Sequence, residues 1–133
     1  MKNKISVPTE SQSQIAVVNW FHVQYPTKVI FAIPNGAWLH GTKLQRIQQA
    51  NKMKREGLLK GVSDLFIAVP RNGLRSSHGL FLEMKREGET ASSISDEQRL
   101  FLDQMFALGF DAHWAAGFDQ AKEIIEKYMK EVI

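Results

Sequence analysis

Residues 79–86 read GLFLEMKR, and their pattern is the most informative one in the chain. The two leucines and the methionine alternate with the other side chains, which is typical of a β-strand whose successive residues point to opposite faces. Glu83 and Lys85 therefore project from one face of a strand that otherwise belongs to a core. An acid and a base are predicted to lie side by side on the face of a sheet.

A second strand is predicted shortly before this one, over residues 64–69 (DLFIAV). Its continuous apolar run is typical of a strand that is buried on both faces. Asp64 begins the run, 19 positions before Glu83. If the two strands pair through the connection 70–78, Asp64 approaches Glu83 at one end of the sheet.

The rest of the chain completes an α-β-(α)-β-β-α-β-α order. A turn is predicted at Pro34-Asn35-Gly36, and the second helix is expected to carry Leu44, Ile47 and Met53 on one stripe. We expect an α/β (α+β) fold with a four-stranded mixed sheet and helices on both faces. The predicted helices cover residues 9–25, 42–56, 95–109 and 118–131, and the outer strands cover 28–33 and 110–115.

Composition limits the classes of protein to consider. A chain of 133 residues with 44% apolar and 23% charged residues fits one globular domain, which we place at 1–133. It has no cysteine, which excludes disulfide scaffolds, zinc knuckles and thiol nucleophiles. No apolar run approaches the ~20 residues of a membrane span, and no phosphate-binding G-x-x-x-x-G-K-[ST] loop occurs. We therefore expect a cytoplasmic protein without a membrane partner or a nucleotide cofactor.

The charge is unevenly distributed along the chain. Residues 1–75 hold 11 Lys and Arg against 3 Asp and Glu, whereas residues 76–133 hold 6 against 11. A dense basic run is either a solvated helix face or a surface that contacts nucleic-acid phosphates. The candidate DNA-binding residues are Lys43, Arg46, Lys52, Lys54, Arg55 and Lys60.

Two carboxylates at one end of a sheet form an oxygen-rich site that suits Mg²⁺ or Mn²⁺. Asp64 and Glu83 supply these carboxylates, and the Met84 backbone carbonyl is a candidate further ligand. Lys85 would orient the attacking water and offset charge on a phosphate. Taken alone, the Glu-x-Lys pair is also compatible with a surface ion pair.

Three segments resemble the VRR-NUC domain, the virus-type replication-repair nuclease of the PD-(D/E)XK superfamily. They are GVSDLFI at 61–67, GLFLEMKREG at 79–88 and SDEQRLFL at 95–102. The resemblance extends from Glu10 to the last helix and implies a restriction-endonuclease-like core. One departure is Ser63, which stands where the superfamily has the proline of its name.

The resemblance also implies roles for individual residues. It makes Asp64 and Glu83 the metal-binding carboxylates and Lys85 the catalytic lysine. Gln98 matches the Glu-Gln element of the family and is a candidate catalytic residue, although a capping box with Ser95 also explains it. Glu10 matches a position where the superfamily often adds a further metal-binding carboxylate, although a first-turn glutamate is also favoured by the helix dipole.

The function implied is that of a Mg²⁺- or Mn²⁺-dependent, structure-specific DNA endonuclease. Small stand-alone phage and bacterial members further imply a homodimer that resolves four-way (Holliday) junctions in DNA repair or recombination, within a bacterial or phage-infected cell. Two alternatives stay open within the DNA-binding class: a nuclease of the same fold that cuts flaps or plain duplex, and a DNA-binding module without catalysis. A third alternative is an interaction domain whose basic run is a solvated helix face.

Overall fold

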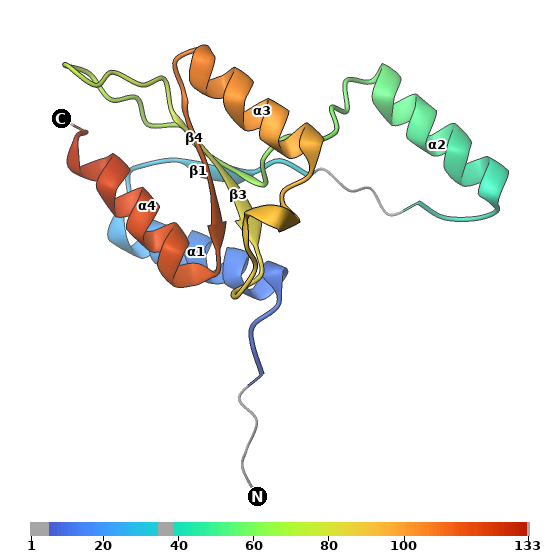
Figure 1. Cartoon of the computed structure of the whole chain (residues 1–133), viewed down its shortest axis with the longest axis horizontal. Helices are drawn as coiled ribbons and strands as arrows, with labels where there is room; N and C mark the ends of the chain where they lie inside the picture. Colours follow the sequence, from blue (N-terminus) through green and yellow to red (C-terminus); the bar gives the residue numbers. More distant parts are fainter. Residues whose placement is uncertain (1–5, 35–38, 133) are drawn as a thin grey trace, which may run out of the picture.

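The structure is a computed structural model that describes residues 6–34 and 39–132. The predicted turn at Asn35-Gly36 lies outside these residues. Within them, no helix is long and apolar enough to cross a membrane. The elements, in chain order, are α1 (Glu10–Gln24), β1 (Ile30–Ala32), α2 (Lys43–Arg55), β2 (Leu65–Ile67), β3 (Leu80–Lys85), the 3₁₀ turn η1 (Ala91–Ser93), α3 (Asp96–Ala107), β4 (Asp111–Ala116) and α4 (Phe118–Lys130) (Figure 1).

The four strands form one mixed sheet in the order β1-β2-β3-β4. The first three run antiparallel, whereas β4 is parallel to β3 because the chain returns through α3. Helices cover both faces of the sheet, because α1 and α4 pack on one face and α3 packs on the other. The predicted four-stranded mixed sheet and the predicted α+β class are confirmed.

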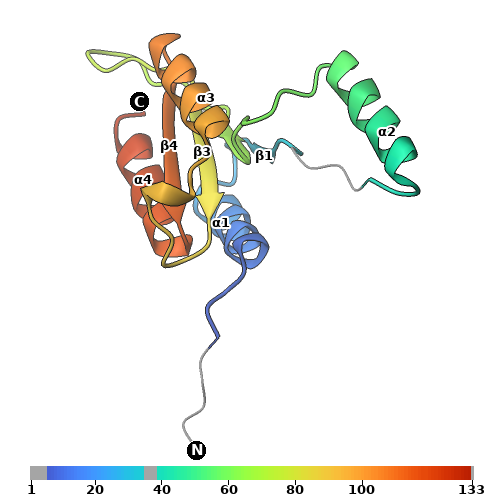
Figure 2. The same ribbon diagram turned by 45° about the vertical axis from the view of Figure 1, so that its right-hand side comes forward.

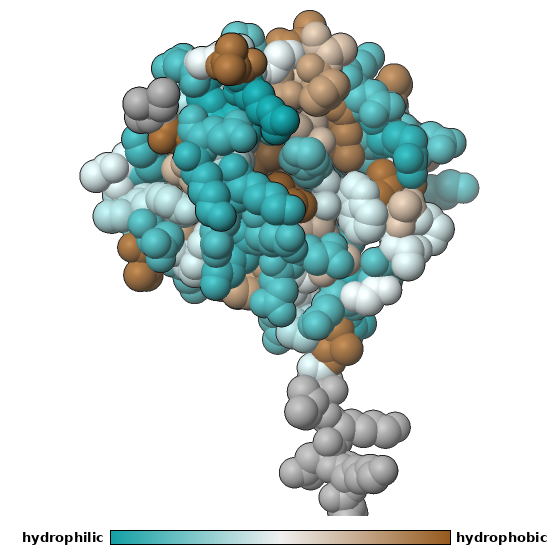
Figure 3. All heavy atoms as spheres, turned by 60° about the vertical axis from the view of Figure 1, so that its left-hand side comes forward, coloured by the Kyte–Doolittle hydropathy of each residue, from teal (hydrophilic) through white to brown (hydrophobic). Residues whose placement is uncertain are grey.

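Helices α1 and α4 pack on one face of the sheet and form the main core with it. Alternation along β2 and β3 points five apolar side chains at these helices, and all five are fully buried: Leu65, Ile67, Leu80, Leu82 and Met84. Val17 and Phe21 of α1 meet them from one side, and Ile125 of α4 meets them from the other. The side of the molecule that carries α4 is largely hydrophilic at the surface (Figure 3), so this helix buries one face and solvates the other.

The opposite face of the sheet is covered only in part. Helix α3 lies over β3 and β4, where the Phe101 ring contacts the Phe81 ring with centroids 5.2 Å apart. Along β2, Leu65 and Ile67 are buried, but Phe66 is only half-buried and Ala68 is exposed. The prediction that residues 64–69 are buried on both faces is therefore wrong, because none of the described helices covers β1 and β2 on this side.

Helix α2 stands apart from the rest of the fold (Figures 1 and 2), and none of its residues is buried. Leu44 is 64% exposed and Ile47 is 48% exposed, so the predicted apolar stripe does not pack. The physical reason is helical geometry: Leu44 and Met53 are nine residues apart, which at about 100° per residue places them on opposite sides of the helix. A capping box between Thr42 and Gln45 defines the first turn of α2.

Candidate active site

The antiparallel register of β2 and β3 brings the predicted acidic residues together. Leu65 pairs with Leu82, so Asp64, one residue before β2, lies beside the end of β3. The Asp64 Oδ2 atom accepts a hydrogen bond from the Met84 backbone N–H at 2.7 Å. Glu83 points to the α3 side of the sheet, where it meets Asp64 and Lys85. The structure therefore gathers Asp64, Glu83 and Lys85 at one end of the sheet.

The two carboxylate oxygens of Glu83 differ in their contacts with the described residues. Its side chain is buried, with 2% of its surface exposed. Its Oε1 atom accepts a hydrogen bond from Gln98 Nε2 at 2.8 Å and lies 3.9 Å from Lys85 Nζ. Its Oε2 atom is also buried, but no described residue donates a hydrogen bond to it. A buried carboxylate oxygen without a partner is costly, so this atom points to a ligand that the site is built to hold.

Burial also changes the acidity of both carboxyl groups. Desolvation, followed by the charge of Asp64, raises the pKa of Glu83 to about 8, against an opposing effect of Lys85. Desolvation raises the pKa of Asp64 as well, and the Met84 N–H limits that rise. A protonated Glu83 would donate to the Asp64 carboxylate. Two carboxyl groups that cannot both ionise easily are a natural place for a cation.

Gln98 uses one amide for two purposes. Its Oε1 atom accepts from the Ser95 backbone N–H at 2.9 Å and closes the capping box of α3. This fixes the orientation of the amide, so that Nε2 points at Glu83. The capping explanation and the site explanation of Gln98 are thus compatible, because the start of α3 carries the residue that orients Glu83.

Gly61 brings the chain before β2 against the start of α3. A Cβ atom at this position would lie 2.4 Å from the Glu97 carbonyl oxygen, and the backbone has a φ of +97°. Both facts require glycine, because a side chain would clash and would be strained at positive φ. The close approach places the segment leading to Asp64 beside the helix that carries Gln98.

Glu10 begins α1 near the same end of the sheet. Burial raises its pKa, and the charge of Asp64 is the next largest cause. Arg86 fixes the approach to this helix, because its guanidinium donates to the Val7 and Pro8 carbonyls at 2.8 Å and 3.2 Å. Among the described residues, no three Asp, Glu, His or Cys side chains form a group that could hold an ion. The role of Glu10 as a ligand stays a prediction.

The residues present nevertheless fit a hard divalent cation. Mg²⁺ is usually held by one or two carboxylates together with waters and substrate phosphates, so two carboxylates are sufficient. The Met84 carbonyl is a reasonable further ligand, because the N–H and C=O of one strand residue point toward the same neighbour and this N–H reaches Asp64. The unpartnered Oε2 of Glu83 beside Asp64 is the observation that supports the fit.

The candidate DNA-binding residues are gathered mainly on one element. Five of the six lie on α2, which carries no acidic residue between its first and last positions. Lys60 lies outside α2 and pairs with Glu97 of α3 at 3.3 Å. The basic run is therefore mainly an exposed arm that stands apart from the sheet. The five on the arm are Lys43, Arg46, Lys52, Lys54 and Arg55.

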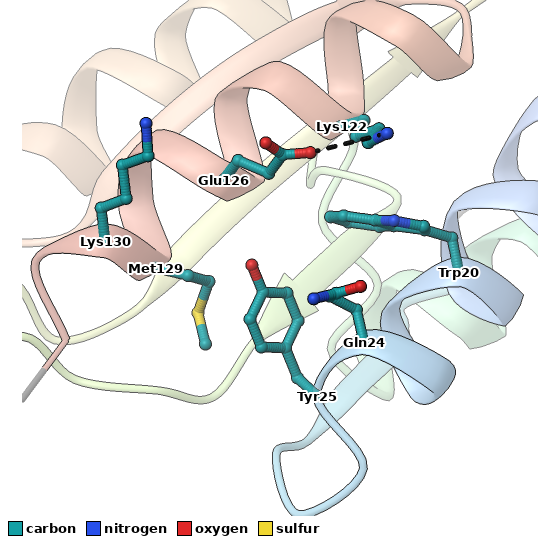
Figure 4. Close-up of a pocket in the computed structure, with 7 residues that line it drawn as sticks. All are labelled: Trp20, Gln24, Tyr25, Lys122, Glu126, Met129 and Lys130. Atoms are coloured by element: carbon teal, nitrogen blue, oxygen red, sulfur yellow. Dashed lines mark ion pairs between the residues drawn. The ribbon is translucent and has the colours of Figure 1, made fainter.

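A separate hollow of about 300 Å³ lies between the C-terminal half of α1 and one side of α4 (Figure 4). Trp20 and Tyr25 line it from α1 and the residue that follows it, and Lys122 and Glu126, which form an ion pair, line it from α4. These helices cover the face of the sheet opposite to the side chain of Glu83. The hollow is therefore not part of the acidic site.

Comparison with known proteins identifies the fold and the family. The sequence profile of the VRR-NUC domain matches residues 8–119, which is most of the chain. The chain belongs to the VRR-NUC domain family. A solved structure described as a VRR_NUC domain protein is similar to it, with 26% sequence identity, a TM-score of 0.70, and coverage of 96% of this chain and 93% of that one. No curated protein matches the chain.

Family membership confirms the resemblance found in the sequence and makes this VRR-NUC chain a nuclease domain of the PD-(D/E)XK type. Two positions that shape the site were not among the predicted residues. Gly61 lies within the motif GVSD and Arg86 directly follows Lys85, so both are adjacent to residues that the sequence identified. Only contacts distant in the sequence, with Glu97 and with the start of α1, show what they do.

Proposed function

We propose that this VRR-NUC chain is a Mg²⁺- or Mn²⁺-dependent endonuclease that hydrolyses phosphodiester bonds in branched DNA. One observation carries the proposal. Glu83 has one oxygen held by Gln98 and Lys85, whereas its other oxygen is buried beside Asp64 without a donor. Ionising both carboxyl groups in this arrangement is costly, and a cation would offset that cost.

Asp64, Glu83 and the Met84 carbonyl would hold the ion. When bound, a divalent cation in such a site stabilises the charge that develops on the phosphate and on the leaving oxygen. Lys85, whose side chain is only 14% exposed, supplies a fixed positive charge and orients the attacking water. Gln98 keeps Glu83 in place by its hydrogen bond. The attacking water bonds to phosphorus and releases a proton to solvent, the bond to the leaving oxygen breaks, and that oxygen takes a proton from solvent.

Helix α2 would hold the DNA. Its five basic residues are exposed, and an arm of this kind suits contacts with the phosphate backbone, which give affinity without sequence preference. The remaining candidate, Lys60, forms an ion pair with Glu97 and would exchange this partner for a phosphate. Only residues 56–63 separate the arm from Asp64 in the sequence, which supports its placement on the flank of the substrate.

We further propose that the chain works as a homodimer on four-way junctions. A two-fold dimer presents two sites to a substrate of the same symmetry, and 133 residues offer little surface for gripping a branched duplex alone. Leu44 and Ile47 are exposed on a helix that buries none of its residues in the described part of the chain, which also favours a further contact.

The test is a cleavage assay on labelled four-way junction, flap and linear duplex, with Mg²⁺, with Mn²⁺ or with EDTA. We compare the wild type with Glu83→Ala and with Glu123→Ala, a matched control on α4 whose carboxylate is exposed and paired with Lys127. Metal-dependent, symmetric cleavage of the junction by the wild type and the control, but not by Glu83→Ala, is expected. Cleavage that survives in Glu83→Ala would contradict the assigned site.

The same assay distinguishes the alternatives. Preferred cleavage of the flap or the linear duplex would assign the chain to another nuclease of this fold. Binding to the junction without cleavage in either metal would make it a DNA-binding module, and the absence of both would favour an interaction domain. The mass of the free protein by light scattering tests the dimer, since a monomer that cleaves the junction fully contradicts it.

A further inference from the structure

An exposed aromatic surface lies on the same face of the sheet as the acidic site. Phe31 of β1 pairs with Phe66 of β2, which pairs with Phe81 of β3, so the three rings form a row on one face. Alternation along β2 and β3 puts Asp64 and Glu83 on that face too. Helix α3 covers the row at Phe81 but leaves Phe31, on the edge strand, 47% exposed.

Strand geometry places the exposed ring close to the reaction centre. The Ile33 N–H donates to the Asp64 carbonyl at 2.9 Å, which puts Ile33 next to Asp64 on the neighbouring strand. Phe31 is two residues further along the same face, about 7 Å away at the rise of a β-strand. This distance is about the spacing of one or two nucleotides. A DNA strand whose phosphate reaches Asp64 therefore has its neighbouring bases near Phe31.

The three phenylalanine rings of the row contact one another. The Phe31 and Phe66 centroids are 5.5 Å apart, and the Phe66 and Phe81 centroids are 4.5 Å apart. The Phe66 ring lies over Gly79, where a Cβ atom would come within 2.6 Å of it. Phe31 is thus a positioned ring with packing on one side and solvent on the other. Aromatic rings on an open sheet face are a common platform for unpaired bases.

We infer that Phe31 stacks on an unpaired base next to the cleaved phosphate and thereby makes the chain selective for branched DNA. The inference rests on the proposed nuclease function. In a continuous duplex both faces of every base are covered by neighbouring pairs, so no base can stack on the ring. At a branch point a base can leave the stack, and the ring then adds affinity for that DNA alone. The occupant is a base rather than a second protein because the surface is continuous with the site that the DNA strand must enter.

The experiment compares binding of a junction that carries one unpaired nucleotide beside the cleavage position with binding of a fully paired duplex. It is done in EDTA, so that the DNA stays intact. Phe31→Ala should lose about tenfold affinity for the junction, the size expected for one stacked base, and should keep its affinity for the duplex. Phe31→Tyr keeps the ring and should bind as the wild type does. Phe106→Ala removes a 71% exposed ring at the far end of α3 and should change neither affinity.

A fluorescent base analogue at the unpaired position gives a direct reading of stacking. Wild type and Phe31→Tyr should quench 2-aminopurine there, and Phe31→Ala should not. Equal losses on both DNAs, or an unchanged preference and quenching in Phe31→Ala, would overturn the inference. So would a fall from dimer to monomer in Phe31→Ala, because the ring would then belong to a protein interface. A wild type that cleaves no DNA refutes the proposed function, whereas cleavage with an unchanged preference in Phe31→Ala refutes only the role of this ring.

Discussion

The buried carboxyl group of Glu83 makes the stability of the protein in EDTA depend on pH. In the unfolded chain its pKa is near 4.5, and in the folded protein burial and Asp64 raise the pKa to about 8. The folded state therefore binds the proton more tightly than the unfolded state does. This stabilising contribution is complete below about pH 4.5 and is lost as the pH rises through about 8.

The size of the change in unfolding free energy follows from the difference between the folded and unfolded pKa of Glu83. One pKa unit corresponds to about 1.4 kcal/mol, so the wild type should lose about 4 kcal/mol of unfolding free energy between pH 5 and pH 9 through this group. Glu83→Gln mimics the protonated side chain at every pH. Its amide can still accept from Gln98, and its NH₂ group can donate to Asp64. We expect the variant to match the wild type at pH 5 and to exceed it by about 4 kcal/mol at pH 9.

Urea unfolding in EDTA, followed by circular dichroism at pH 5, 6, 7, 8 and 9, measures both curves. The difference between variant and wild type isolates the pair Glu83 and Asp64, because groups remote from this pair titrate alike in both proteins. Glu123→Gln, which changes an exposed carboxylate, should run parallel to the wild type. If Glu83→Gln also runs parallel to the wild type, Glu83 is not a buried acid, and the argument for an orphaned oxygen at the site fails.

Four further outcomes are expected. Mg²⁺ affinity measured by calorimetry should rise between pH 6 and pH 8.5, because the ion displaces the proton of Glu83; a flat profile would contradict this. Gly61→Ala should lower the urea unfolding free energy by about 2 kcal/mol more than Gly57→Ala, because Gly57 has a similar positive φ but no atom within 4 Å of its Cβ position. Ser63→Ala should leave stability unchanged or raise it by up to about 1 kcal/mol in the same assay, since the buried Ser63 hydroxyl has no partner among the described residues. Changing three basic residues of α2 to glutamine should reduce the slope of log binding constant against log salt by about 2 to 3, whereas three changes on α4 should not; the residues are Lys52, Lys54 and Arg55 against Lys122, Lys127 and Lys130.

Local patterns were sufficient to predict the elements and the acidic pair. Capping boxes located α1 and α3, apolar spacing located α2 and α4, and alternation along residues 79–86 put Glu83 and Lys85 on one face. The approach of Asp64 to Glu83 needed only the assumption that two consecutive strands pair, which is the usual arrangement. These features depend on neighbours in the sequence, and a single sequence contains that information.

Features that depend on what covers a surface were harder to predict. The apolar run DLFIAV is compatible with a strand that is buried on two faces and with a strand that places an aromatic ring on an open face. Phe66 is half-buried because α3 extends only over β3 and β4. The predicted apolar stripe with Leu44 and Met53 was wrong for a different reason, since their spacing does not keep them on one side of a helix. The contacts of Gln98 and Gly61 join distant segments, and their function emerges only from the fold.

The incomplete cover of the sheet links the chemistry to the choice of substrate. A helix over β1 and β2 would bury Phe31 and stabilise the domain by removing exposed aromatic surface from water. It would also block the face on which Asp64 and Glu83 are proposed to meet a phosphate. The chain instead places its second helix outside the sheet as a basic arm. The smaller core and the open face that we propose to contact DNA thus have one structural origin. Substitutions that cover or fill this face are therefore expected to stabilise the protein and to reduce cleavage together.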